Sequence, residues 1–129
     1  MSSRAFDLLR SNHTSDVDSL DRFESVVESV LRGDPSAVLD EANLAGPARL
    51  SEDTVYEYLV ELSAVGALMT RLFWVCPITR GTTAEADTLS EFASLRECDK
   101  CGEMHEFRAR DIQVHFLASD ELIRAARDL

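Results

Sequence analysis

Two cysteines spaced as Cys98-x-x-Cys101 are the residues of this chain whose types and spacing most directly indicate chemistry. A third cysteine, Cys76, makes the total odd, and no secretory signal is visible at the N-terminus, so the spacing favours a metal site or a redox pair over a disulfide framework. His105 completes the pattern Cys-x-x-Cys-x-x-x-His, from which an imidazole can turn back toward a bound ion. His115 is the second choice for such a ligand.

No pattern typical of an enzyme accompanies these cysteines. The serines lie outside any Gly-x-Ser-x-Gly turn, and the five glycines are each explained by a turn or a helix end. Carboxylates are abundant, but nothing in the sequence marks a buried pair. A cysteine with His105 or His115 would imitate a thiol-protease dyad, but the Cys-x-x-Cys spacing favours metal. We therefore expect no enzymatic activity.

Apolar periodicity predicts a mixed α+β chain. Residues 11–19 are polar and are interpreted as a linker, which makes His13 a solvated linker histidine. The second long helix is expected to open at Asp34-Pro35, and the third at a Ser51 cap. Helices are expected over residues 4–10, 20–33, 35–46, 52–66 and 119–129, with a brief one near 89–95. Strands are expected over residues 67–69 and 72–75, as a hairpin turning at Thr70-Arg71, and over 106–109 and 112–117.

The segment Leu50-Ser51-Glu52-Asp53-Thr54-Val55 opens the third helix, and Gly66-Ala67-Leu68 ends it. Three helices followed by a hairpin, with this entry and exit, resemble the winged-helix proteins over about residues 20–76. The resemblance implies a three-helix domain with a β wing, and DNA binding with the third helix in the major groove. An unrelated small helical bundle is the alternative.

The charges of the third helix argue against DNA. The net charge is −11, and no lysine or arginine lies between Ser51 and Thr70. Phosphate contacts need hydrogen-bond donors, and carboxylates in a groove walled by phosphates would be repelled. Three arginines could contact a DNA backbone, namely Arg49, Arg71 and Arg80. Three are too few to offset the net acidic charge of the chain.

We therefore expect a regulatory or adaptor protein that uses this helix for protein contact. Tyrosine suits a polar interface because it is rigid and amphipathic. A partner of basic or mixed charge is expected, and a homodimer and a DNA-binding regulator that senses metal or redox state are the alternatives. The predicted partner-binding residues are Glu52, Asp53, Tyr56, Glu57 and Glu61.

Cys76-Pro77, directly after the expected wing, together with Cys98-x-x-Cys101-Gly102, resembles a zinc ribbon. Such ribbons offer four thiolates from two Cys-x-x-Cys knuckles. The first knuckle departs from the pattern, because Thr79 stands where the partner of Cys76 belongs. The resemblance implies a structural zinc ion held by Cys76, Cys98, Cys101 and His105. A metal-free relic of a ribbon and a redox dithiol remain open.

The expected organisation has three parts: an N-terminal helix and linker over 1–19, a winged helix over 20–76, and a zinc-ribbon-like module with a closing helix over 77–129. No apolar run approaches the roughly 20 residues that a membrane helix needs, so a cytoplasmic protein without membrane contact is expected.

Overall fold

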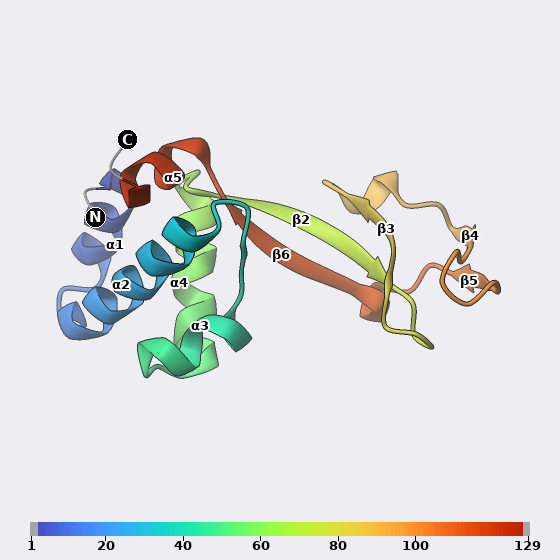
Figure 1. The fold of residues 1–129 in the computed structure, drawn as a ribbon, viewed down its shortest axis with the longest axis horizontal. Coiled ribbons are helices and arrows are strands. Elements are labelled where there is room, and N and C mark those ends of the chain that lie inside the picture. Colours follow the sequence, from blue (N-terminus) through green and yellow to red (C-terminus); the bar gives the residue numbers. More distant parts are fainter. Residues whose placement is uncertain (1–2, 128–129) are drawn as a thin grey trace. The chain divides into compact units, whose positions relative to one another are not determined.

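The computed structural model describes residues 3–127, which contain five α-helices and two antiparallel sheets (Figure 1). The predicted α+β class is therefore confirmed. The chain forms two compact units. We call Met1–Met69 together with Phe116–Leu129 the helical unit, and Thr70–His115 the inserted unit, because the chain leaves the first at Met69 and returns to it at Phe116. The predicted limits after residues 19 and 76 stay a prediction.

Four helices come first along the chain, with the short strand β1 between the second and the third. The other strands follow, and one helix closes the order. Two short 3-10 turns, η1 and η2, interrupt the strands. In order, the elements are α1 (Arg4–Asn12), α2 (Val17–Gly33), β1 (Val38–Leu39), α3 (Glu41–Ala48), α4 (Glu52–Ala64), β2 (Leu68–Val75), β3 (Thr82–Ala86), η1 (Leu89–Glu91), β4 (Leu95–Glu97), β5 (Met104–Glu106), η2 (Ala109–Asp111), β6 (Ile112–Ala118) and α5 (Asp120–Arg127).

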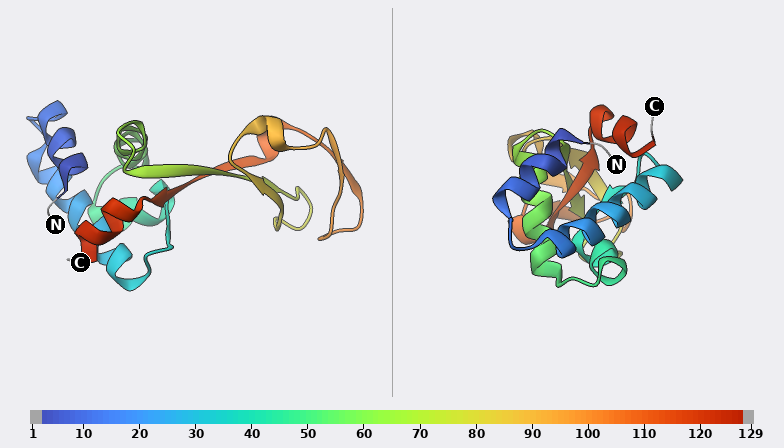
Figure 2. Two further views of the ribbon diagram at one scale, coloured as in Figure 1. Left: turned by 90° about the horizontal axis from the view of Figure 1, so that it is seen from above. Right: turned by 90° about the vertical axis from the view of Figure 1, so that its left-hand side faces the viewer.

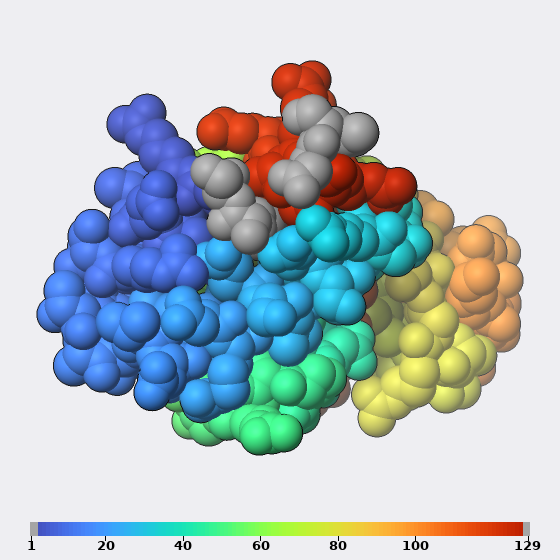
Figure 3. Space-filling view, turned by 60° about the vertical axis from the view of Figure 1, so that its left-hand side comes forward, coloured from blue at the N-terminus to red at the C-terminus, as the bar shows by residue number. Residues whose placement is uncertain are grey.

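The core of the helical unit is built on α2, which packs against α1, α3 and α5. Figure 3 shows α2 with α5 on one side and α3 on the other, and Figure 2 shows the same helices from two further directions. Apolar residues recur every three or four positions in α2, so they share one face. Each fully buried large side chain contributes about 1.5–3 kcal/mol. The buried apolar and aromatic residues of α2 and α4 are Leu20, Phe23, Val27, Leu31, Val55, Tyr58, Leu59 and Leu62.

The start of α4 is as predicted, whereas the start of α3 is not. Ser51 caps α4, and its side chain accepts a hydrogen bond from the Thr54 amide at 3.1 Å. The helix expected from Asp34-Pro35 begins instead at Glu41, after Asp40, whose side chain accepts from the Asn43 amide at 2.7 Å. Asp34 forms a local turn with Ser36, so the first cap-like residue does not open a helix.

The segment between that turn and α3 is a strand, β1, because it pairs with the distant β6. Val38 lies opposite Leu117, and Leu39 lies opposite Phe116. This ladder satisfies the backbone of β1, and Leu39 is fully buried beneath it. Pairing across the length of the chain therefore overrides the local helical pattern.

The predicted hairpin at Thr70-Arg71 is wrong, because β2 runs unbroken from Leu68 to Val75. Neither residue has the backbone freedom that a two-residue turn demands. The strand order of the larger sheet is β1-β6-β2-β3, and β2 pairs with β3 from Leu72 opposite Ala86 onward. The chain thus continues from β2 into the inserted unit and comes back through β6.

The inserted unit has a small aromatic core. The ring of Trp74, which is fully buried, makes edge contacts with Phe92 and Phe107 at centroid distances of 5.9 and 5.7 Å. The helix expected near residue 92 is only the 3-10 turn η1. The strand expected over 106–109 lies earlier, at β5, which pairs with β4. None of the helices in residues 3–127 is long and apolar enough to span a membrane.

Candidate metal centre

The four predicted ligands converge within the inserted unit. Cys76 follows β2 directly, Cys98 follows β4, Cys101 lies in the next turn, and His105 lies in β5. One ligand atom of each residue lies within 4.8 Å of those of all the others. The Nε2 atom of His105 is 3.4 Å from the Sγ atom of Cys76 and 3.2 Å from that of Cys101. This arrangement is compatible with a metal ion, since a tetrahedron with bonds of 2.3 Å has edges of about 3.8 Å.

The loop that begins at Cys76 is closed by backbone hydrogen bonds. The Cys76 amide donates to the Gly81 carbonyl at 2.8 Å, and the Arg80 amide donates to the Cys76 carbonyl at 2.9 Å. The Thr79 amide donates to the Cys76 sulfur at 3.4 Å. Arg80 has a left-handed φ of 66°, which turns the chain.

The loop that begins at Cys98 repeats this pattern. The Cys98 amide donates to the Glu103 carbonyl at 2.8 Å, and the Gly102 amide donates to the Cys98 carbonyl at 2.9 Å. The Lys100 amide donates to the Cys98 sulfur at 3.4 Å. Gly102 has a left-handed φ of 78°, where a glycine is free of strain.

The backbone hydrogen bonds that close the two loops correspond position by position, whereas the amide that donates to the sulfur lies three residues after Cys76 and two residues after Cys98. Thr79 stands at the position of Cys101, and Arg80 stands at the position of Gly102. The first loop keeps the backbone of a sulfur-centred knuckle but offers one thiol where the second offers two. His105 supplies the fourth ligand atom, and its place in β5 is set by the pairing of His105 with Arg96 in β4.

Hydrogen bonds prepare the Cys76 sulfur to carry negative charge. Burial, the largest effect, raises the pKa of Cys76, but hydrogen bonds from Thr79, Ile78 and His105 together lower it to about 6. At Cys101 the Glu103 amide lowers the pKa, but burial and the neighbouring sulfurs of Cys98 and Cys76 outweigh it, and the pKa is raised. Charge repulsion disfavours a second thiolate among closely spaced thiols, and a cation bound between them offsets that repulsion.

The second-choice ligand, His115, lies outside this cluster. Its ring contacts that of Phe73 in β2 at a centroid distance of 4.3 Å. Its Nδ1 atom is buried and has no hydrogen-bond partner among the described residues. His115 thus packs within the sheet and contributes no ligand.

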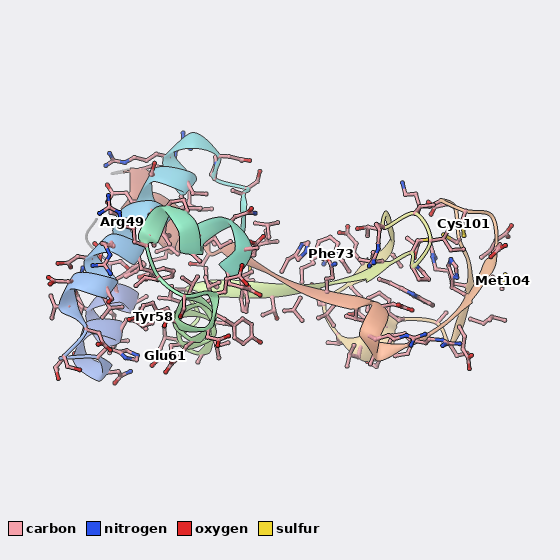
Figure 4. All side chains as sticks on the ribbon, turned by 90° about the horizontal axis from the view of Figure 1, so that it is seen from below. Arg49, Tyr58, Glu61, Phe73, Cys101 and Met104 are labelled. Carbon is pink, nitrogen blue, oxygen red and sulfur yellow. The ribbon has the colours of Figure 1, made fainter. Side chains whose placement is uncertain are left out.

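The predicted partner-binding residues all lie on α4, and Figure 4 labels one of them, Glu61. Tyr56 is 48% exposed, and its ring meets that of Phe116 edge-on. Glu61 is half-buried, and its Oε2 atom lies 2.5 Å from the Nε2 atom of His13. The other three are exposed at the first two turns of the helix: Glu52, Asp53 and Glu57.

The three arginines proposed for DNA contact have different surroundings. Arg49 is exposed at the end of α3, in the left-handed conformation. Arg71 pairs with Asp87 at 2.7 Å and with Glu85 at 3.5 Å, which raises its pKa through hydrogen bonds. Arg80 is exposed in the first knuckle. Part of the expected positive charge is therefore neutralised within the inserted unit.

The contact between His13 and Glu61 escaped the sequence analysis. The polar composition of residues 11–19 indicated a solvated linker, but His13 is half-buried, and its ring packs edge-on against that of Tyr58. The interpretation of His13 as a solvated residue is wrong, because tertiary packing of α1 against α4 covers it. No local signal could have found a pair that is 48 residues apart.

Comparisons with protein-family models, with curated proteins and with solved structures found no match to this chain. The function must therefore be argued from the residues themselves.

Proposed function

We propose that this chain is a non-enzymatic adaptor or regulatory protein that binds a protein partner through the acidic face of α4. The acidic face consists of Glu52, Asp53, Tyr56, Glu57 and Glu61. The observation that carries the proposal is the charge of this face, which holds four carboxylates and no lysine or arginine. Such a face favours a basic partner surface, because complementary charges steer association and select partners.

The charge of the whole helical unit supports this proposal. Residues 1–69 and 116–129 contain sixteen acidic and seven basic residues, a net charge of −9, whereas residues 70–115 contain eight and six, a net charge of −2. Tyr56 adds exposed aromatic area beside Glu57. Aromatic residues are enriched at the centres of protein interfaces and polar residues at their rims, so Tyr56 fits the centre of such an interface and the surrounding carboxylates fit its rim.

DNA binding is the less favoured function for the same physical reason. Most of the affinity for DNA comes from cations laid on phosphates. Arg71 is already engaged with Asp87 and Glu85, and Arg49 stands at the start of a segment that leads into the carboxylates of α4. A winged-helix domain that placed α4 in a DNA groove would bring its carboxylates close to the DNA phosphates, and the like charges would repel.

We further propose that α2, α3 and α4 form a three-helix winged-helix domain, with β2 and β6 as the wing. The inserted unit then corresponds to a degenerate zinc ribbon between these two strands. Three thiolates and one imidazole are ligands that zinc prefers, and the four together leave no open position for a reacting water. Zinc in this centre is structural, so the proposed protein has no metal-dependent catalytic step.

A site-specific crosslinking experiment tests the partner surface. Tyr56→p-benzoylphenylalanine, expressed in the cells from which the sequence comes, is expected to give a crosslinked product with one partner protein. Glu57→Lys in the same chain should abolish that product, because it places a cation at the centre of the acidic face. The partner's contact segment, identified by mass spectrometry, is expected to be rich in lysine and arginine.

The matched control places the crosslinker at Ser29, an exposed position on α2, where no such product is expected. A separate titration with fluorescent duplex DNA at physiological salt should show no binding. Tight binding of the unchanged chain to duplex DNA, or equal crosslinking from both positions, would contradict the adaptor function.

A further inference from the structure

A second group of metal-ligand side chains lies in the helical unit, apart from the cysteines. It consists of His13, Glu57 and Glu61, whose ligand atoms all lie within 4.8 Å of one another. Glu57 and Glu61 are one helical turn apart in α4, so both carboxylates emerge on one side. Figure 4 labels Glu61 and Tyr58, which project from α4 toward the part of the unit that holds α1.

The imidazole of His13 is held in place from several directions. Its backbone amide donates to the carbonyls of Leu9 and Arg10, at 3.1 and 3.2 Å, which fixes the residue at the end of α1. Its ring lies edge-on to Tyr58 at a centroid distance of 5.3 Å and an interplanar angle of 77°. A ring held in this way loses little freedom when it binds an ion.

The two nitrogens of the ring face different carboxylates. Nε2 lies 2.5 Å from Glu61 Oε2, whereas Nδ1 lies 3.8 Å from Asp16 Oδ2. Metal-binding histidines commonly direct the nitrogen that does not bind the ion toward a carboxylate, which orients the ring and raises its basicity. Asp16 lies on the matching side of the ring, and its carboxylate has to approach Nδ1 from 3.8 Å to accept a hydrogen bond in this role.

The carboxylates of this cluster outnumber the nearby cations, which are the imidazole of His13, when protonated, and the guanidinium of Arg22. Three carboxylates surround one imidazole, which carries at most one positive charge. Burial, and after it the negative charges of these carboxylates, raise the pKa of the Tyr58 hydroxyl, whereas the charge of Arg22 lowers it. An open cavity of about 240 Å³, lined by His13, Asp16, Glu57 and other residues of α2 and α4, adjoins the cluster and has room for water ligands.

We propose that His13, Glu57 and Glu61 bind a divalent first-row transition-metal ion, with Asp16 as the outer partner of His13 and water in the remaining positions. One nitrogen and two or more oxygens suit ions such as Mn²⁺ and Co²⁺, whereas three thiolates and one imidazole suit Zn²⁺. The two sites therefore differ in metal preference. Because Glu57 and Glu61 belong to the acidic face, a bound ion lowers the negative charge of that face.

Binding of Mn²⁺ tests this site without involving the cysteines or any partner protein. The full chain is passed over a chelating resin and titrated with Mn²⁺, and the free ion is measured by electron paramagnetic resonance. One Mn²⁺ ion per chain is expected to bind, and the NMR signals of His13 and the Tyr58 ring should broaden before those of other residues. The substitutions Glu57→Gln and Glu61→Gln, each tested alone, should weaken binding at least about tenfold, since loss of an outer partner alone costs that much.

Glu52→Gln is the matched control, because Glu52 is an exposed glutamate of the same helix outside the cluster, and its Mn²⁺ affinity should equal that of the unchanged chain. Cys98→Ser should likewise leave Mn²⁺ binding unchanged. Mn²⁺ that remains free, or equal affinity in Glu57→Gln, Glu61→Gln and Glu52→Gln, overturns the proposal. Because the readout is the ion itself, this failure is distinguishable from failure to find a protein partner.

Discussion

The helical unit buries a connected cluster of apolar side chains drawn from all five helices, whereas the inserted unit buries Trp74 against two half-buried phenylalanines and gathers its thiols at one point. A small unit with so little apolar area needs a further source of stability, and a structural metal is a common one. The comparison leads us to expect that burial of apolar area suffices to fold the helical unit, whereas the inserted unit depends on a metal ion bound by its candidate ligands.

Removal of the metal should produce the largest difference in stability between the two units. Structural zinc contributes about 10–16 kcal/mol to the folding of small zinc domains, so a strong chelator is expected to unfold residues 70–115. The helical unit should keep its amide-exchange protection, because its core contains no ligand. Hydrogen exchange measured residue by residue checks this, and equal loss of protection in α2 and β5 would break the comparison.

The correspondence of the two knuckles predicts a rescue. His105→Ala removes one ligand and should weaken zinc binding at least about tenfold. Adding Thr79→Cys to that variant should restore the affinity, because the backbone hydrogen bonds that close the two loops put position 79 in the place of Cys101. Competition against a zinc-binding dye measures both variants, and a double variant as weak as His105→Ala would show that the knuckles are not equivalent.

A cavity in the helical core should destabilise the helical unit and leave the inserted unit unaffected, which is the reverse of the effect of metal removal. Leu59→Ala removes a fully buried side chain and should cost about 2–5 kcal/mol of unfolding free energy in the helical unit. Zinc content is expected to remain unchanged, because no ligand is touched. Urea unfolding followed by helical circular dichroism, alongside metal analysis, provides the check, and loss of zinc from this variant would contradict the division.

Loss of the α4 cap should be the smallest effect. Ser51→Ala removes the acceptor of the Thr54 amide and should lower the stability of the helical unit by about 1 kcal/mol. Ser51→Asp keeps an acceptor there and serves as the control. The unfolding midpoint in urea distinguishes them, and an equal loss in both variants would mean that the cap contributes nothing.

Local chemistry allowed much of this molecule to be predicted. The periodicity of α2, the Ser51 cap of α4 and the grouping of Cys98, Cys101 and His105 follow from residue types at short spacing, whereas Cys76 was included through the resemblance to a zinc ribbon. The strand β1 could not be predicted, because Val38 finds its partner at Leu117. The contact of His13 with Glu61 and the unbroken β2 escaped prediction for the same reason, since pairing between distant segments decides them.

The metal centre itself provides the most direct test of the account. X-ray absorption spectroscopy of the purified chain, with zinc content measured on the same sample, should show one zinc ion bound by three sulfurs at about 2.3 Å and one nitrogen at about 2.0 Å. Cys98→Ser should reduce the zinc content and lose one sulfur. A chain without zinc whose inserted unit is nevertheless folded, or a zinc ion bound only by oxygen and nitrogen, would contradict the account.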